Sequence, residues 1–477
     1  MNRRLALLAL ALCFTSLLAA QDTRTVAEPV LPPVCEKLDA ELQTSGRSLA
    51  EADEGKLDSA RIQKAIDHCG KGHGVLLRAQ GAANAFLSGP LYLQSGVTLI
   101  VDKGVTLYAS RDPSLYEDFG LDKHPVLSPN NQHRGHTTRF DAPPPCGTVS
   151  ESGRGCRPLI TADRVIGAGV MGEGTIDGRG GEKMLGSKFS WWDLAEQARA
   201  GGRQQVFRLI VADYADNFTL YRITLKNSPN FHVVYNHGDG FTVWGLKIDT
   251  PQRLARNTDG VDPGNGSKNV TITHSYIRTG DDNVAIKGGP GGATQMTISH
   301  NHFYWGHGMS IGSETDGGVS KIRVYDLSLD GPDNGIRIKS NGSRGGPTHD
   351  VVYDDVCVRN SPNPITLDTG YTAAGTVKGN SPPTMREITL HNVRVSGGGK
   401  ISFNGYDQDH RIAAALDGVE IADAASYTYS VNHADLSLGP DPTNLQLPAG
   451  EDATLQGKPA NGTPSSCTEK FVDFPSR

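Results

Sequence analysis

The chain lacks the features that mark several common classes of protein. It has no run of basic residues and a formal net charge of −6, so nucleic acid is not an expected partner. Beyond the first 20 residues it has no long apolar segment, so no membrane-spanning helix is expected in the mature protein. Its cysteines share no metal-ligand spacing with histidines, which argues against a zinc site. These absences leave a soluble protein without nucleic-acid or membrane partners.

Apolar residues are sparse, at 37% of 477 residues, whereas glycine is abundant, at 57 positions. Glycine accepts positive φ without steric cost, and solenoids with many tight turns use it in this way. The length suffices for several ordinary domains or for one long repeat domain. The composition is therefore compatible with a single repeat structure.

The N-terminus has the pattern of a secretory signal peptide. Arg3 and Arg4 precede an apolar run from Leu5 to about Ala20 that ends in small residues. An uncleaved membrane anchor is the alternative, but the run of ~16 residues is shorter than the ~20 that a spanning helix usually needs. We expect cleavage near Ala20 and a secreted protein, with the periplasm as a second possible location.

The cysteines outside this segment predict disulfides, because their number is even and the protein is expected in an oxidising compartment. Six cysteines allow 15 pairings. The pairing that we favour ties the N-terminal cap, closes a short loop and pins the C-terminal tail: Cys35–Cys69, Cys146–Cys156 and Cys357–Cys467.

A short strand pattern recurs along the chain. Seven segments show the apolar alternation of a strand, and each begins 23 to 37 residues after the one before: Phe218–Leu225, Phe241–Ile248, Val270–Ile277, Met296–Phe303, Ile322–Leu329, Val351–Val358 and Ile388–Val395. Turn-forming residues fill the gaps. No helical pattern of 10 or more residues lies between the copies from 270 to 360, which argues against βαβ units. Regular strands at this period predict a parallel β-helix.

The open ends of a solenoid need caps. Residues Asp58–Cys69 have the pattern of an amphipathic helix, with Asp58 as the N-cap and an apolar stripe that comprises Ile62, Ala65, Ile66 and Cys69. This helix would cover the N-terminal end.

The remaining segments complete the expected organisation. We expect a long surface loop over 110–160 and a short helical stretch within 183–205. The expected domains are a signal peptide at 1–20, an N-terminal extension at 21–50, a β-helix catalytic domain at 51–430 and a C-terminal tail or cap at 431–477. A capped solenoid leaves no long open sheet edge, so we expect a monomer.

Charged residues recur at the coil interval in the middle of the chain. Successive intervals of 23, 25 and 30 residues separate four of them: Asp259, Asp282, His307 and Arg337. If each interval is one coil, these residues stack on one wall. Asp281 adjoins Asp282, and at a turn both can reach the same point. Clustered carboxylates resist ionising together, so one stays protonated, which suits acid–base cleavage of a glycosidic bond.

Two cations could complement this acidic cluster. Arg337 and Lys339 are two residues apart, so they share a strand face and could hold the carboxylate of an acidic sugar. His307, between two glycines, could tune the acid or touch the substrate. The stretch from Asp259 to Asp262 could instead bind calcium, but its spacing does not fit the EF-hand pattern.

Together these motifs resemble the polygalacturonases of glycoside hydrolase family 28. The matching motifs are Asn257–Gly260, Gly280–Asp282, Gly306–Gly308, Ser310–Ser313 and Arg337–Lys339, with the flanking segments Phe86–Leu91, Gly174–Gly178 and Asn227–His232. The resemblance covers roughly residues 50–410. It implies a right-handed parallel β-helix and hydrolysis with inversion, without a metal or other cofactor.

The resemblance also implies catalytic roles. Asp281 matches the general acid, and Asp259 with Asp282 matches the pair that activates the attacking water. His307 matches the histidine beside the acid. Position 283 is Asn where many members carry Cys, and we assign this residue no catalytic role.

Three further residues match substrate-binding positions of the family. Arg337 and Lys339 match the residues that bind the substrate carboxylate, and Tyr371 matches a subsite tyrosine in a looser alignment. The rhamnogalacturonan-cleaving branch tends to lack the histidine that is equivalent to His307, so its presence favours a homogalacturonan substrate.

The expected function is therefore secreted hydrolysis of the α-1,4-galacturonosyl linkages of pectin or polygalacturonate. The alternatives are a hydrolase of decorated pectin, such as rhamnogalacturonan or xylogalacturonan, and a non-catalytic polysaccharide-binding β-helix. A lyase would need a basic cluster that the sequence does not show. The choice between internal and chain-end cleavage stays open.

Overall fold

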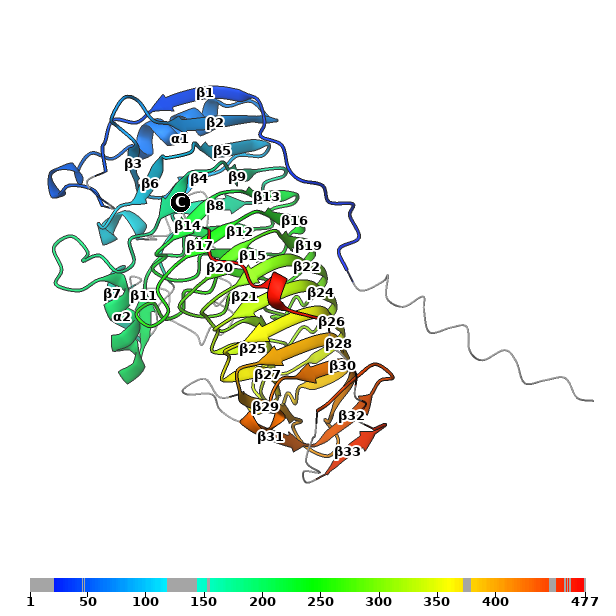
Figure 1. Cartoon of the computed structure of the whole chain (residues 1–477). Coiled ribbons are helices and arrows are strands. Elements are labelled where there is room, and N and C mark those ends of the chain that lie inside the picture. Colours follow the sequence, from blue (N-terminus) through cyan, green and yellow to red (C-terminus); the bar gives the residue numbers. More distant parts are fainter. Residues whose placement is uncertain are drawn as a thin grey trace, which may run out of the picture.

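The computed structural model describes residues 21–44, 46, 48–117, 144–151, 155–371, 379–445, 452–458, 460, 462 and 465–475. Their strands form a right-handed parallel β-helix, whose coils stack along one axis (Figure 1). The predicted signal peptide at 1–20 and most of the predicted loop at 110–160 lie outside the described residues. Within the described part of the chain, no helix has the length and apolar character that a membrane crossing requires.

Two large sheets make up the walls of the β-helix. The 20-stranded sheet contains β1 (Val34–Asp39), β2 (His73–Arg78), β3 (Ala85–Ser88), β5 (Val97–Val101), β6 (Thr106–Ala109), β9 (Gly169–Met171), β10 (Thr175–Asp177), β13 (Phe218–Tyr221), β14 (Thr224–Lys226), β16 (Asp239–Trp244), β17 (Lys247–Asp249), β19 (Ser267–Thr273), β20 (Tyr276–Arg278), β22 (Ala293–Phe303), β24 (Val319–Asp330), β26 (Pro347–Arg359), β28 (Thr384–Ser396), β30 (Ile412–Ile421), β32 (Ala434–Leu438) and β33 (Ala453–Gln456). Neighbouring strands pair in parallel, as the predicted fold requires.

The 11-stranded sheet runs along another wall, with shorter strands in chain order. It contains β4 (Leu91–Tyr92), β8 (Ile160–Asp163), β12 (Ile210–Asp213), β15 (Val233–Asn236), β18 (Val261–Gly264), β21 (Val284–Ile286), β23 (Met309–Ile311), β25 (Asn334–Lys339), β27 (Asn363–Asp368), β29 (Gly399–Asn404) and β31 (Tyr427–Asn432). The sequence pattern did not predict this sheet as a separate wall, because most of its strands are too short to show an alternation.

All seven predicted strand segments are strands of the 20-stranded sheet. Each contains one residue with positive φ, which separates two short strands in the first three segments and lies inside one long strand in the other four. These residues are Arg222, Gly245, His274, His300, Asp326, Asp355 and Asn392. Gly, Asn, Asp and His tolerate this left-handed conformation better than most residues, which is why such residues recur at this point of the coil.

The interior consists of apolar rows that run from coil to coil. One row pairs Ile272 with Ile298 and then Val324, and all three side chains are fully buried. Full burial of such a side chain contributes about 1.5–3 kcal/mol relative to exposure. Because each row buries its members against the coils on both sides, no coil is stable without its neighbours.

The predicted cap helix is α1 (Ser59–His68), and it buries Ile62, Ala65 and Ile66. Asp58 stands at the N-cap position, but the expectation that its side chain caps the helix is wrong, because it makes no capping hydrogen bond. Its carboxylate instead accepts hydrogen bonds from the Leu87 N–H at 2.8 Å and from Arg61 at 2.7 Å. Asp58 therefore ties the helix to the first coils.

The other short elements lie outside the coils. The helical stretch expected within 183–205 is α2 (Trp191–Gln197), which begins with a capping box between Ser190 and Asp193. Near it, β7 (Thr148–Ser150) and β11 (Arg203–Gln205) form an antiparallel ribbon. The 3₁₀ turns are η2 (Glu51–Asp53), η3 (Pro113–Tyr116), η4 (Ala198–Ala200), η5 (Ala424–Ser426) and η6 (Thr468–Lys470).

The β-helix is longer than the predicted limits of 51–430. Strand β1 pairs with β2 on the N-terminal side, and β32 and β33 continue the sheet on the C-terminal side. These strands were not predicted because the end segments are polar. An end coil has a neighbouring coil on one side only, so it buries fewer apolar side chains.

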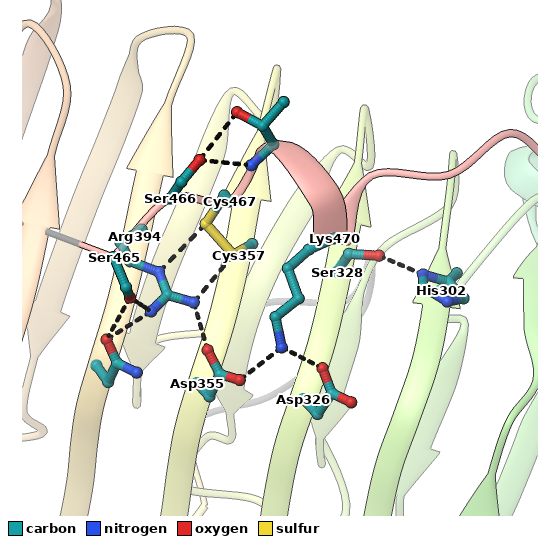
Figure 2. Close-up of a disulfide and its surroundings, with 12 residues drawn as sticks. His302, Asp326, Ser328, Asp355, Cys357, Arg394, Ser465, Ser466, Cys467 and Lys470 are labelled. Atoms are coloured by element: carbon teal, nitrogen blue, oxygen red, sulfur yellow. Dashed lines mark hydrogen bonds and ion pairs between the residues drawn. A yellow bond between two sulfur atoms is a disulfide. The ribbon is translucent and has the colours of Figure 1, made fainter.

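All three predicted disulfides are present: Cys35–Cys69, Cys146–Cys156 and Cys357–Cys467. The third fixes residues 465–475, which we call the C-terminal tail, against the outer face of the 20-stranded sheet (Figure 2). Lys470 of this tail lies between Asp326 and Asp355 and pairs with both carboxylates. The tail therefore crosses several coils.

Candidate active site

The predicted catalytic residues lie at the edge of the 11-stranded sheet, on adjacent coils. The register pairs Val261 of β18 with Val284 of β21, and Val284 with Met309 of β23. Asp259, Asp282 and His307 each stand two residues before these strands, so they occupy the same position in three successive coils. The stacking that the sequence spacing predicted is therefore present.

Asp282 is the charged centre of the group. It is 1% exposed, and its Oδ2 accepts a hydrogen bond from Lys339 Nζ at 2.7 Å. Its Oδ1 accepts one from Ser310 Oγ at 2.7 Å and a longer one from Arg337 Nη1 at 3.4 Å. Burial raises the pKa of Asp282, but the Lys339 and Arg337 cations outweigh burial and the repulsion from Asp281, so its pKa is lowered.

The strand geometry explains why two cations reach this carboxylate. Arg337 and Lys339 lie on one face of β25, as predicted from their spacing. Ser310 of β23 pairs directly with Arg337 in the sheet, so both reach the same oxygen of Asp282. Lys339 is the deeper cation, with 6% of its side chain exposed, against 13% for Arg337.

Asp281 faces His307 across the gap between two coils. Oδ1 of Asp281 lies 2.9 Å from Nδ1 of the imidazole and also accepts the N–H of Asp282. Burial raises the pKa of Asp281, but the hydrogen bond and charge of His307 outweigh it and lower that pKa. Conversely, burial lowers the pKa of His307 and the Asp281 carboxylate raises it, with a net rise. The contact therefore favours a protonated imidazole beside an ionised carboxylate.

The turn that carries the two aspartates is held by Asn283. Its amide donates to the carbonyl oxygens of Ile277 and Trp305 at 3.1 Å, and its Oδ1 accepts the Gly308 N–H at 2.9 Å. Asn283 is fully buried, and these bonds join the turn before β21 to the turn that carries His307. We therefore assign it a positioning role, which sequence reasoning did not find.

The glycines of the site motifs are required by close backbone approach. A Cβ at Gly308, where φ is +75°, would lie 1.9 Å from the Asn334 carbonyl oxygen. A Cβ at Gly280 would lie 2.0 Å from the Ala255 carbonyl oxygen. Both positions flank catalytic candidates, so the glycines let adjacent coils come close at the site.

Asp259 lies in a second acidic group with Asp262 and Lys287, which the sequence analysis did not assign to the site. Lys287 Nζ is 3.3 Å from Oδ2 of Asp259 and 3.8 Å from Oδ2 of Asp262. Both aspartates are 3% exposed, and among the described residues neither oxygen of Asp262 has a hydrogen-bond partner. Asp262 lies within β18 and Lys287 directly follows β21 in the next coil, a proximity that only the strand register reveals.

Burial dominates the charge state of this second group. It raises the pKa of Asp262 to about 7, even though Lys287 opposes the rise. Burial and the charge of Asp262 together raise the pKa of Asp259 well above its ordinary value. The sequence predicted a raised pKa for one carboxyl of the cluster. The pKa is raised at Asp259 and Asp262, with burial as the largest cause, and it is lowered at Asp281.

The backbone of Asp259 rests on a buried histidine. Nδ1 of His232 lies 3.0 Å from the Asp259 carbonyl oxygen, and Nε2 lies 2.8 Å from Thr250 Oγ1. Burial lowers the pKa of His232 to about 4, so it stays neutral near pH 7. This explains the histidine of the motif Asn227–His232 as a support for the catalytic coil.

Tyr371, which the looser alignment matched to a subsite tyrosine, lies beside the two cations. The Arg337 Cζ and the Lys339 Nζ are 5.3 Å and 5.2 Å from the centre of its ring. Its backbone is fixed by a hydrogen bond from its N–H to the Ser340 carbonyl oxygen and by one from Asn341 Nδ2 to its own carbonyl oxygen. Tyr371 therefore borders the site.

Three side chains of the site lie close enough together to be considered as ligands of one metal ion. Ligand atoms of Asp281, Asp282 and His307 lie within 4.8 Å of one another. Both oxygens of Asp282, however, already accept bonds from Ser310, Lys339 or Arg337. At Asp259 and Asp262, where calcium was the alternative, the Lys287 ammonium already lies beside both carboxylates.

Comparison with known proteins places these features in a family. The model of the glycosyl hydrolases family 28 matches residues 117–437. The chain is 41% identical to an endo-polygalacturonase of Pectobacterium carotovorum over 87% of its length and 93% of that protein. It is 36% identical to a polygalacturonase of Ralstonia nicotianae, covering 94% of this chain and 92% of that protein.

Solved structures agree. The polygalacturonase from Erwinia carotovora superposes with a TM-score of 0.74 at 39% identity, covering 87% of this chain and all of that chain. An exopolygalacturonase from Thermotoga maritima has the same fold, with a TM-score of 0.64 at 20% identity. From the matched residues and the extent of these similarities, the chain belongs to glycosyl hydrolase family 28 and is a glycosidase.

Proposed function

We propose that the protein hydrolyses the α-1,4-galacturonosyl linkages of pectin and polygalacturonate by general acid–base catalysis. The observation that carries the proposal is the arrangement of three carboxyl groups, an imidazole and a pair of cations on four successive coils. Acid–base cleavage of a glycosidic bond needs a carboxylic acid on one side and a carboxylate that activates water on the other. Polygalacturonate adds a carboxylate on each sugar, which the cations can bind.

The proton for the leaving oxygen comes from the pair His307 and Asp281. In the free site the proton resides on the imidazole, since the pKa of His307 is raised and that of Asp281 is lowered. When a sugar covers the pair and excludes water, burial favours the neutral form of both groups. The proton then moves along the 2.9 Å hydrogen bond to Asp281, which donates it to the glycosidic oxygen.

The attacking water is activated by Asp259 and Asp282. Asp259 is the stronger base of the two, because its raised pKa means a higher proton affinity once it is ionised. Asp282 stays ionised through its bonds to Lys339 and Ser310, so it orients the water and stabilises the positive charge that develops on the sugar. Inversion at the anomeric carbon is the stereochemical course that the family resemblance implies.

The sugar carboxylate is held by Arg337, with Lys339 behind it. Among the residues that the structure describes, Asp282 is the one hydrogen-bond acceptor of Arg337, at 3.4 Å, so the other donors of the guanidinium can bind the substrate. Tyr371, against which both cations lie, provides an apolar wall for the sugar ring.

The similarity to proteins named endo-polygalacturonase favours cleavage within the chain of the polysaccharide. Three disulfides and the signal-like N-terminus favour action outside the cytoplasm. The capped β-helix favours a monomer, and the family resemblance implies that no metal is needed.

The test is release of reducing ends from de-esterified polygalacturonate with a chelator present, while viscosity is followed in parallel. Release with an early fall in viscosity is the expected result. Release with nearly constant viscosity would replace internal cleavage by chain-end cleavage, and absence of release would refute the proposed substrate.

A further inference from the structure

One cation of the 11-stranded sheet has no role in the chemistry described so far. Arg208 stands two residues before β12, as Phe231 stands before β15 and Asp259 before β18. The register pairs Ile210 with Val233, and Val233 with Val261. Arg208, Phe231 and Asp259 therefore occupy the same position in three successive coils, and Arg208 extends the catalytic row towards the N-terminal end.

Arg208 differs from Arg337, Lys339 and Lys287 in having no hydrogen-bond acceptor or ion-pair partner within the described residues. No ion pair or hydrogen bond of its guanidinium is present there, and its buried Nε has no acceptor. Burial lowers the pKa of Arg208, whereas the charges of Asp262 and Asp259 partly restore it. A half-buried guanidinium without an acceptor is unfavourable unless something else supplies one.

Phe231 fixes the place of this cation. The Arg208 Cζ lies 5.3 Å from the centre of the Phe231 ring, and Lys287 Nζ lies 5.5 Å from the same centre. The ring is half-buried and lies against both Arg208 and Lys287. Asp262 and Asp259 act on Arg208 through their charges, but within the described residues neither carboxylate forms an ion pair with its guanidinium.

Arg208 and Arg337 lie on opposite sides of the catalytic aspartates along the axis of the β-helix. Strand β12 lies two coils before β18, and β25 lies two coils after β21. Arg337 lies inside β25, level with Ser310, so it is displaced along its strand from the row that contains Arg208. Coils are ~4.8 Å apart, so Arg208 is about 10 Å along the axis from the coil of Asp259. A polysaccharide that crosses these coils along the axis would place different sugars at the two arginines.

We propose that Arg208 and Phe231 form a second carboxylate-binding subsite, which takes a galacturonate unit on the opposite side of the scissile bond from Arg337. The inference rests on the proposed function, since it assumes a substrate with a carboxylate on successive sugars. The guanidinium of Arg208 accepts that carboxylate through its unused donors, and the Phe231 ring packs against the apolar face of the sugar.

The test is binding of an α-1,4-linked galacturonate pentamer by calorimetry, in an Asp281→Asn background that prevents turnover. Arg208→Gln is expected to weaken binding about 10- to 100-fold, because one charge-assisted contact is lost. Arg208→Lys keeps the charge but lacks the planar guanidinium, so its affinity for the pentamer should lie between that of Arg208→Gln and that of the parent. Arg222→Gln is the matched control, since Arg222 is 49% exposed and pairs with Glu28 away from this sheet.

Unfolding midpoints of the same variants separate a binding role from a structural one. If Arg208→Gln binds the pentamer as tightly as its parent while the parent binds and the wild type cleaves, the subsite is refuted and the proposed function stands. A lowered midpoint with unchanged affinity would likewise refute it, as a purely structural contact with Phe231. If the parent does not bind the pentamer and the wild type does not cleave it, both are refuted.

Discussion

Nδ1 of His307 lies 2.9 Å from Oδ1 of Asp281, although the two residues are 26 positions apart in the chain. One coil of the β-helix separates them, and the parallel register brings them together. The contact raises the pKa of His307 and lowers that of Asp281, and in the proposed mechanism the imidazole holds the catalytic proton until substrate binds. The following predictions depend on this and related contacts.

Replacing His307 by Gln should move the alkaline limb of the pH–rate profile. In the wild type the pair loses its proton as pH rises through the raised pKa of His307. In His307→Gln the Asp281 carboxyl must hold the proton alone, and a carboxyl titrates at lower pH than an imidazole. We expect the alkaline limb of kcat/KM to shift to lower pH and kcat to fall at least about 10²-fold at pH 7. An unchanged alkaline limb would contradict the proposal that His307 holds the proton that Asp281 donates.

Replacing Asp262 by Asn should move the acidic limb in the same direction for a different reason. After burial, the charge of Asp262 is the largest cause that raises the pKa of Asp259. Its removal lowers the pKa of Asp259, so the base is ionised at lower pH. The measurement is kcat/KM between pH 3 and pH 8, with Asp102→Asn as an exposed control. A shift to higher pH would refute the role of Asp259 as base.

The same substitution should stabilise the protein at alkaline pH. The folded-state pKa of Asp262, about 7, lies above that of an unfolded aspartate, so stability falls as pH rises towards 7 and stays low above it. Asp262→Asn removes this loss, which at ~1.4 kcal/mol per pKa unit is a few kcal/mol at most. Urea unfolding at pH 5 and pH 8 tests it: the variant should gain stability over wild type at pH 8. A variant that is less stable at pH 8 would show that the charge is compensated.

Asn283→Ala should loosen the turn that carries both aspartates. It removes one of two donors from each of the Ile277 and Trp305 carbonyls, which keep the N–H groups of Tyr304 and Thr279. It also leaves the Gly308 N–H without its acceptor, at about 1–3 kcal/mol for the unsatisfied group. We expect a lower unfolding midpoint together with a lower kcat, and little change in KM. Full activity in a destabilised variant would mean that Asn283 stabilises the coil without positioning Asp282.

Removing the disulfide of the C-terminal tail should affect stability and leave the reaction intact. Cys357–Cys467 closes a segment of 110 residues, whereas Cys146–Cys156 closes one of 10. The chain-entropy model gives about 5 kcal/mol for the long loop and about 3 kcal/mol for the short one. The double alanine variant of the first pair should therefore unfold at lower urea than that of the second, with kcat unchanged where both are folded. The opposite order would show that Lys470 and its neighbours hold the tail without the bond.

The sequence predicted the fold and the main site because both follow from one period. The strands of the 20-stranded sheet are long enough to show their alternation, and Asp259, Asp282 and His307 repeat once per coil. The 11-stranded sheet was not predicted as a wall, since a strand such as Val284–Ile286 is too short to carry a pattern. The positions at which the chain turns from one sheet to the next depend on packing between coils, which the sequence pattern does not show.

The residues that sequence reasoning missed depend on that second sheet. Lys287 and Asp262 enter the site only through the pairing of β18 with β21, and Arg208 through the pairing of β12 with β15. The distribution of protons was also missed. One carboxyl of the cluster was expected to stay protonated by repulsion from its neighbours, but at Asp281 the contact with His307 on the next coil lowers the pKa.

The most direct test of the account compares turnover of polygalacturonate by the wild type and by Asp281→Asn. General acid catalysis contributes about 10²–10⁴-fold, so the account predicts that the variant loses at least 10²-fold in kcat while its unfolding midpoint and its affinity for the galacturonate pentamer stay close to those of the wild type. A variant that retains wild-type turnover would contradict the assignment of Asp281 as the acid and with it the proposed mechanism.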